Sequence, residues 1–189
     1  MNNLKIGVRL GLGFAIIVML MLVIGVYSIT KMSQVDHLVG VLVEDKYPKT
    51  VMLNDMKSNL NVIARALRNL ILLDDKEEIK KETQRIIDAR ELIGKRLEEL
   101  TKVVRSDTGK GFLKDVVEAR TAYVESQKTI IALIEANDKE KARTELFTTV
   151  RKTQSAYFAA IDKMIEYQSK EMEKLERTQT TASCRPEVS

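Results

Sequence analysis

The chain has 189 residues, of which 31% are charged, 44% hydrophobic and 5% aromatic, with 2 prolines and 8 glycines. This composition excludes a collagen, a disordered tail and a disulfide scaffold, and so few turn-forming residues argue against a β-sandwich. One histidine and one cysteine make a His- or Cys-ligated metal site and a hydrolase or transferase improbable, and we expect no cofactor. The net charge of +4 comes from interleaved acids and bases, which disfavours nucleic acid as a partner.

The amino-terminal segment is predicted to cross a membrane. Residues 10–30 carry no charge and are rich in Leu, Ile, Val and Met, and a spanning helix needs about 20 such residues. A cleaved signal peptide is the alternative, but its apolar region is usually shorter, and no clear cleavage pattern follows Gly25. Because Lys5 and Arg9 precede the span, residues 1–9 are expected in the cytoplasm and the chain from about Lys31 outside it. In a Gram-negative bacterium that compartment is the periplasm.

Four long helices are predicted between residues 31 and 178. Turn-forming or capping residues at 74–75, 106–109 and 136–138 separate them, and Pro48 is the one interruption in the first. Apolar residues recur every three or four positions in each helix; the first shows the cleanest seam, Leu53, Met56, Leu60, Ile63, Leu67 and Leu70. We therefore predict an all-α protein, in which a transmembrane helix precedes an antiparallel up-down-up-down four-helix bundle roughly 60 Å long.

Polar side chains interrupt the apolar stripes at one depth. Arg90, Arg120 and Thr153 lie on the second, third and fourth helices, respectively. Each is about 15 or 16 residues from the predicted distal turns, which places all three at ~23 Å from the distal end of the bundle. Two arginines at one level repel each other unless an anion lies between them, which favours a small carboxylate as ligand. Tyr123 and Gln127 would add hydrogen bonds. The alternative is that each arginine pairs with a glutamate across the bundle or extends to solvent.

Two further arginines lie off the seam of the first helix. Arg65 and Arg68 are one turn apart, and either belong to a solvated face or offer cations where the helix meets a partner subunit. The charged run 76–82 is interpreted as a solvated helix face. The candidate ligand-binding residues are thus Arg65, Arg68, Arg90, Arg120, Tyr123, Gln127 and Thr153. No catalytic residue or metal ligand is expected.

The organisation resembles the amino-terminal half of a bacterial methyl-accepting chemotaxis protein. The start Met-Asn-Asn-Leu-Lys-Ile-Gly-Val-Arg-Leu, the span and the bundle carry most of the resemblance, which covers about residues 1–180. Residues 61–70 resemble the end of the first bundle helix of that family, and residues 118–123 its third helix. The resemblance implies an inner-membrane chemoreceptor sensor, not an enzyme, that forms a homodimer through its first helices and binds a ligand between helices in the membrane-distal half. Together with the arginines described above, it favours an organic acid or amino acid as the ligand. The full-length form would engage the chemotaxis adaptor and kinase.

The end of the chain departs from that family, whose members continue into a second span and a cytoplasmic signalling domain. Here the sequence stops after Ser183-Cys184-Arg185-Pro186-Glu187-Val188-Ser189, and residues 179–189 are expected to be a disordered or truncated tail. Two alternatives remain open. The chain is the sensor end of a membrane histidine kinase or cyclic-dinucleotide enzyme, or it is a membrane-anchored structural coiled coil without a ligand.

Overall fold

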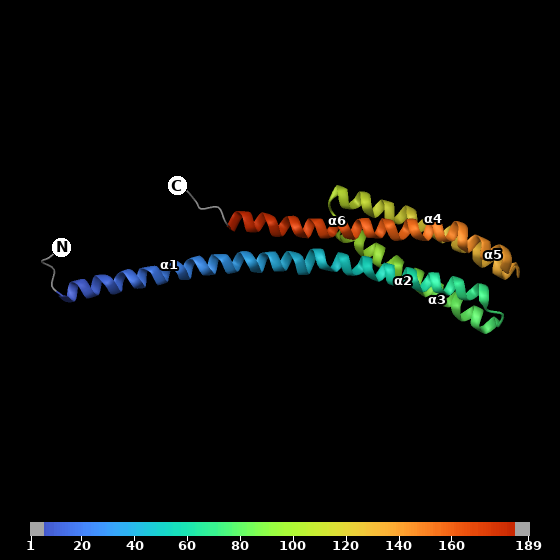
Figure 1. Cartoon of the computed structure of the whole chain (residues 1–189), viewed down its shortest axis with the longest axis horizontal. Helices are drawn as coiled ribbons and strands as arrows, with labels where there is room; N and C mark the ends of the chain where they lie inside the picture. Colours follow the sequence, from blue (N-terminus) through green and yellow to red (C-terminus); the bar gives the residue numbers. More distant parts are fainter. Residues whose placement is uncertain (1–5, 184–189) are drawn as a thin grey trace.

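The computed structural model describes residues 6–183, which are helical apart from short turns, so the all-α prediction is confirmed (Figure 1). Residues 1–5, with the orienting Lys5, and residues 184–189 lie outside the described range. Two of the helical segments are π-helical, η1 and η2. The segments are α1 (Ile6–Val41), η1 (Leu42–Lys46), α2 (Tyr47–Leu72), α3 (Lys76–Val103), α4 (Asp107–Glu135), α5 (Lys139–Glu145), η2 (Leu146–Val150) and α6 (Arg151–Ser183).

The first three segments follow one another without a turn and form one long rod. Its first part, Leu10–Ser33, is apolar and long enough to cross a membrane, and none of it is buried in the structure. Pro48 lies in the first turn of α2, directly after η1. Proline cannot donate a backbone hydrogen bond, and its ring crowds the carbonyl four residues earlier. The wider π turn accommodates both effects and explains why the interruption predicted at Pro48 does not end the rod.

The bundle consists of two antiparallel helix pairs, α2 with α3 and α4 with α6, which pack against each other (Figure 1). The predicted seam of the first helix is buried along its length, because Leu53, Leu60 and Leu67 are all 0% exposed. Side chains from α3, α4 and α6 complete the same core, among them Ile86, Ile130 and Ile161. The 3.6-residue period of the sequence therefore identified the buried faces correctly.

Side-chain caps set where the helices begin. Asp75 accepts hydrogen bonds from the backbone amides of Glu77 and Glu78, both at 2.9 Å, and Asp138 caps α5 in the same way. The two distal turns are also joined directly, since Lys139 Nζ donates to the carbonyl oxygen of Leu73 at 2.6 Å. This contact fixes a common distal end, from which depths along all four helices can be compared.

The last helix differs from its prediction in two places. The π segment η2 interrupts it between α5 and α6, where the sequence predicted one uninterrupted α-helix. At its other end α6 continues to Ser183, so residues 179–183 of the predicted tail are helical. Between the start of α6 and Pro186 the sequence contains no glycine or proline that would end the helix sooner.

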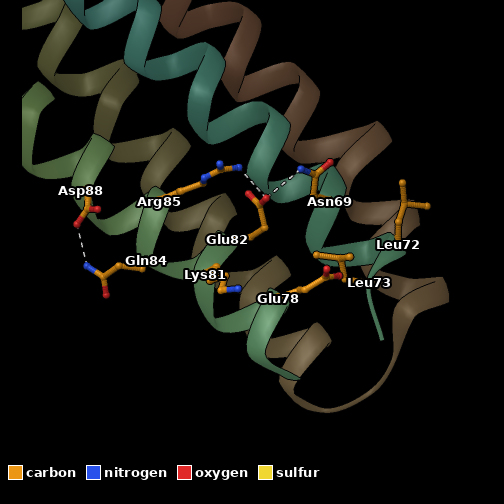
Figure 2. Close-up of a pocket in the computed structure, with 9 residues that line it drawn as sticks. All are labelled: Asn69, Leu72, Leu73, Glu78, Lys81, Glu82, Gln84, Arg85 and Asp88. Carbon is orange, nitrogen blue, oxygen red and sulfur yellow. Dashed lines mark hydrogen bonds and ion pairs between the residues drawn. The ribbon is translucent and has the colours of Figure 1, made fainter. Parts of the chain in front are cut away.

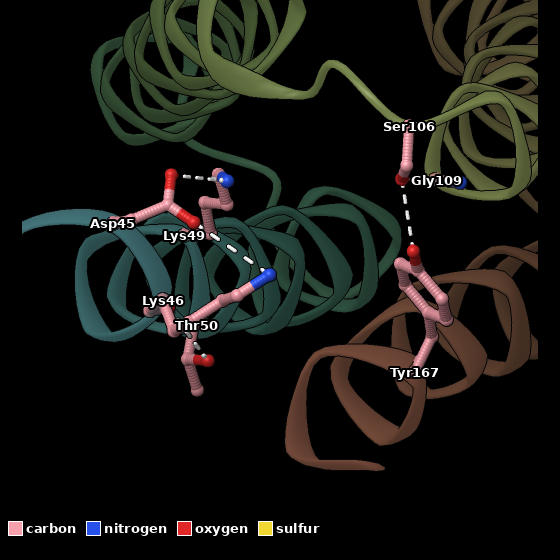
Figure 3. Close-up of polar contacts among 7 residues, drawn as sticks. All are labelled: Asp45, Lys46, Lys49, Thr50, Ser106, Gly109 and Tyr167. Atoms are coloured by element: carbon pink, nitrogen blue, oxygen red, sulfur yellow. Dashed lines mark hydrogen bonds and ion pairs between the residues drawn. The ribbon is translucent and has the colours of Figure 1, made fainter. Parts of the chain in front are cut away.

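The turn between α3 and α4 packs against α6 (Figure 3). Ser106 caps α4 by accepting from the Gly109 amide at 3.2 Å, and its Oγ lies 2.8 Å from the hydroxyl of Tyr167. On the neighbouring helix, buried Lys49 donates to Asp45 at 2.7 Å, across the boundary between η1 and α2 (Figure 3). The contact between Ser106 and Tyr167 joins the α3–α4 turn to α6 at the end of the bundle opposite the distal turns, while the Lys49–Asp45 pair lies within the rod.

Replacing Gly109 with alanine is expected to loosen this end. A Cβ there would lie 2.7 Å from Ser106 Oγ and 2.9 Å from Val104 Cγ1, and both atoms belong to the turn itself. We expect Gly109→Ala to cost about 1–3 kcal/mol of unfolding free energy, as overpacking usually does.

The matched control is Gly111→Ala, because nothing lies within 4 Å of a Cβ at Gly111. There alanine should gain roughly 0.5–1 kcal/mol through helix propensity. Denaturant unfolding followed by circular dichroism compares the two, and equal effects would contradict the steric argument.

Candidate functional site

A polar layer crosses the interior of the bundle at mid-depth. It consists of Arg90 on α3, Arg120, Tyr123 and Gln127 on α4, and Tyr157 on α6. Arg90 is partly buried, and its Nε donates to Oε1 of Gln127 at 2.7 Å. Gln127 is only 1% exposed, so this hydrogen bond lies inside the bundle and joins α3 to α4.

Arg120 extends from α4 toward the same part of α3. Its Nη2 lies 3.8 Å from where a Cβ would stand on Gly94, which is one turn beyond Arg90 on the same helix. Burial is the main cause that lowers the pKa of the Arg90 guanidinium; nearby Tyr123 opposes this shift, the like charge of Arg120 adds to it, and Glu125 opposes it least. The structure thus brings the two arginines together at one level, where their charges repel each other.

Two tyrosines complete the layer. Tyr123 and Tyr157 are each 1% exposed, and their ring centroids lie 6.2 Å apart with the ring planes inclined by 54°. Burial raises the pKa of both phenols, while nearby Arg90 and Arg68 oppose the shift at Tyr123 and Arg120 opposes it at Tyr157. Both phenols are therefore neutral hydrogen-bond donors at physiological pH.

Three polar atoms of this layer are buried and have no hydrogen-bond partner. They are Nη2 of Arg90 and the hydroxyl oxygens of Tyr123 and Tyr157. Within residues 6–183, neither Arg90 nor Arg120 forms an ion pair with a carboxylate. A buried polar group without a partner costs about 1–3 kcal/mol, and more if it is charged. The layer therefore combines unused donors and uncompensated positive charge, which is the chemistry that accepts an anion.

Thr153, another candidate ligand-binding residue, has hydrogen-bond partners within the bundle. Its Oγ1 lies 2.8 Å from Ser126 Oγ and 3.0 Å from the carbonyl oxygen of Thr149, next to η2. Ser126 in turn donates to the carbonyl oxygen of Tyr123 at 2.8 Å. The threonine hydroxyl is thus already used in a contact that joins α6 to α4.

The structure does not bring Arg65 and Arg68 to one site. Both are exposed on α2. Arg68 lines two adjoining grooves, of about 330 and 380 Å³, whose walls include Leu146 and Phe147 of η2. Arg65 lines another groove, of about 460 Å³, between α2 and α3. The spacing of Arg65 and Arg68 along α2 would allow both side chains to lie on one face of the helix. In the structure α3 packs on one side of that face and α6 on the other, so the two arginines line different grooves.

Two residues were missed by sequence reasoning, and one was misjudged. Tyr157 and Ser126 lie on the predicted apolar stripes, and their only signal was a hydroxyl at a core position. Glu82 was assigned to a solvated face, but the residue is 9% exposed because it points at α2, where Asn69 Nδ2 donates to its Oε1 at 3.2 Å (Figure 2). That part of the prediction was wrong.

Comparison with known proteins decides the family. A family model described as "Four helix bundle sensory module for signal transduction" matches residues 3–182. The chain belongs to this family. The match confirms the resemblance to the amino-terminal sensor part of a methyl-accepting chemotaxis protein. A search of curated proteins gave no match.

The sensory module is also similar to a solved structure with little sequence in common. A chain of a structure described as "XylFII-LytSN complex" superposes with a TM-score of 0.57 at 14% identity, covering 66% of this chain and 98% of that chain. At this identity the likeness shows the fold alone. The sensory module is thus an all-α bundle of a signal-transduction family, with an apolar amino-terminal helix compatible with membrane anchoring.

Proposed function

We propose that this sensory module binds a small carboxylate in the polar layer and acts as a binding protein, not as an enzyme. The observation that carries the proposal is the uncompensated charge of Arg90, whose Nη2 is buried without a partner beside a second arginine, Arg120. A carboxylate between the two guanidinium groups would accept charge-assisted hydrogen bonds and offset their repulsion. The hydroxyls of Tyr123 and Tyr157 would donate to the remaining oxygen atoms or to a second acid group.

The proposed route of the signal follows the helices. α1 and α6 extend from the same end of the bundle (Figure 1). Layer residues lie on α3, α4 and α6, while Lys57 Nζ on α2 contacts Asp162 on α6 at 2.5 Å. A ligand that draws α4 and α6 together would therefore move α6 relative to the rod that contains the membrane segment. We propose that the bundle lies in the periplasm, that two copies associate through α2, and that a full-length form addresses the chemotaxis kinase.

A comparison of acids with their amides tests the carboxylate assignment. The full chain, reconstituted in lipid nanodiscs, is titrated calorimetrically with succinate, malate, citrate and benzoate, and with the corresponding amides. We expect at least one acid to bind and its amide to bind at least tenfold more weakly, since a charged hydrogen bond contributes about 1.5–3 kcal/mol. Binding of none of the acids, or equal affinity for acid and amide, would overturn the proposal.

A further inference from the structure

The helix α3 contains one glycine in its interior, at the level of the polar layer. Gly94 is half-buried and lies one turn from Arg90. Glycine in a helix interior lowers the folding equilibrium constant about fivefold relative to alanine. The backbone at this position does not require glycine, because none of the described glycines has a positive φ. What lies beside Gly94 is therefore the feature to explain.

The guanidinium group of Arg120 occupies the space beside Gly94. The nearest atom of another helix to a Cβ built on Gly94 is Nη2 of Arg120, at the ordinary van der Waals distance of 3.8 Å. A methyl group therefore fits at this position, but a longer side chain does not have the same room. Long side chains of a helix lean toward its amino terminus. From position 94 that direction leads to Arg90, so a longer side chain would enter the space between the two arginines.

Arg120 has no polar partner that fixes its position. In the part of the chain that the structure describes, it forms neither a hydrogen bond nor an ion pair. Arg90 differs, because its Nε is held by Oε1 of Gln127 at 2.7 Å. A long side chain without a partner keeps much of its rotamer freedom. The room beside Gly94 is therefore what allows Arg120 to lie next to Arg90.

We propose that Gly94 is a positioning residue of the carboxylate site, and that position 94 must stay as small as glycine or alanine for Arg120 to lie beside Arg90. This inference rests on the proposed function, since it concerns the second of the two guanidinium groups that would hold the acid. Gly94 does not touch the acid and acts through Arg120. A larger side chain would turn Arg120 away and leave Arg90 alone to bind the carboxylate.

The affinity of size variants for acids tests this role. The full chain in lipid nanodiscs is titrated calorimetrically with succinate, malate, citrate and benzoate. Gly94→Ala should keep every affinity within about threefold and raise the folding equilibrium constant about fivefold, because a methyl group fits and alanine favours the helix. Gly94→Leu should remain folded, since leucine also favours helices. It should bind each acid that the unchanged protein binds at least tenfold more weakly, because one charged donor is displaced.

The matched control is Gly111→Leu, because nothing lies within 4 Å of a Cβ at Gly111. It makes the same chemical change on α4 and should leave acid affinity unchanged. Unchanged affinity in Gly94→Leu, or an equal loss in Gly111→Leu, would overturn the inference. A role of Gly94 in packing alone would lower the stability of Gly94→Leu without lowering its affinity for acids.

A stability cycle without any acid tests the position of Arg120 directly. Gly94→Leu and Arg120→Ala are made singly and together, and denaturant unfolding gives the four folding equilibrium constants. We expect Gly94→Leu to be at least threefold more favourable when Arg120→Ala is present, because the guanidinium no longer competes for the space. Additive effects would mean that Arg120 does not lie beside Gly94 and would overturn the inference. Coupling without acid binding contradicts the proposed function alone, whereas acid binding without coupling contradicts this inference alone, so the two failures are distinguishable.

Discussion

Arg120→Ala should abolish binding of the acidic ligand, with a loss of about 100-fold or more, while the ligand-free protein stays as stable as before or becomes more stable. The affinity falls because one of two guanidinium groups that would hold the carboxylate is removed, and paired hydrogen bonds of this kind are strong. Stability does not fall because Arg120 has no carboxylate partner in the described chain and its charge lowers the pKa of Arg90. Calorimetric titration and thermal unfolding of the same preparation measure both quantities.

The control for Arg120→Ala is Arg105→Ala, which removes an exposed arginine at the turn before α4, outside the layer. It should change neither the affinity for the acid nor the melting temperature. A structural ion pair predicts the opposite pattern for Arg120, a loss of about 3–5 kcal/mol because a buried acid would be left alone. A strongly destabilised Arg120→Ala protein with unchanged affinity would therefore end the carboxylate proposal.

The double substitution Arg90→Met with Gln127→Leu should raise the free energy of unfolding by about 1–4 kcal/mol and eliminate acid binding. It replaces a buried charge and its hydrogen-bonded amide by apolar side chains of similar size, a change that is often stabilising. Arg90→Met alone should stabilise less, because it leaves Oε1 of the buried Gln127 without its donor at 2.7 Å. That orphaned acceptor costs about 1–3 kcal/mol.

Unfolding of the single and double variants, followed by circular dichroism, separates the gain from removing the buried charge from the cost of the orphaned acceptor. The informative quantity is the difference between them, since it isolates the cost of the unpaired Gln127 amide. A double variant less stable than the unchanged protein would show that the polar layer is a structural network rather than a site held ready for a ligand.

Local signals in the sequence predicted the helices and their faces well. The seam that contains Leu60 is buried because apolar residues spaced three or four positions apart lie on one face of a helix, and that face packs against the core. Asp75 and Ser106 cap the helices at which their short polar side chains indicated starts. Depth from the distal turns placed Arg90 and Arg120 at one level, because a helix has a constant rise per residue.

What the sequence did not predict depends on how the helices are rotated against one another. Arg65 and Arg68 are neighbours on α2, yet they line different grooves, because α3 and α6 cover different sides of that helix. Glu82 lies in a run of charged residues and gave no sign of burial. Tyr157 looked like ordinary core, since the sequence cannot show whether a buried hydroxyl has a partner. Such features arise from tertiary contacts between residues far apart in the chain.

The π turn η1 has a consequence for how the two halves of the long rod are oriented. A π turn holds one residue more than an α-helical turn, and one residue corresponds to about 100° of rotation around the helix axis. The faces of α1 are therefore out of phase with the seam of α2 by more than a quarter of a revolution. The direction in which each side of the apolar segment faces, relative to the bundle, is consequently set by the angular offset at residues 42–46. Any fusion of this bundle to another anchor must preserve that offset to keep the same angular register.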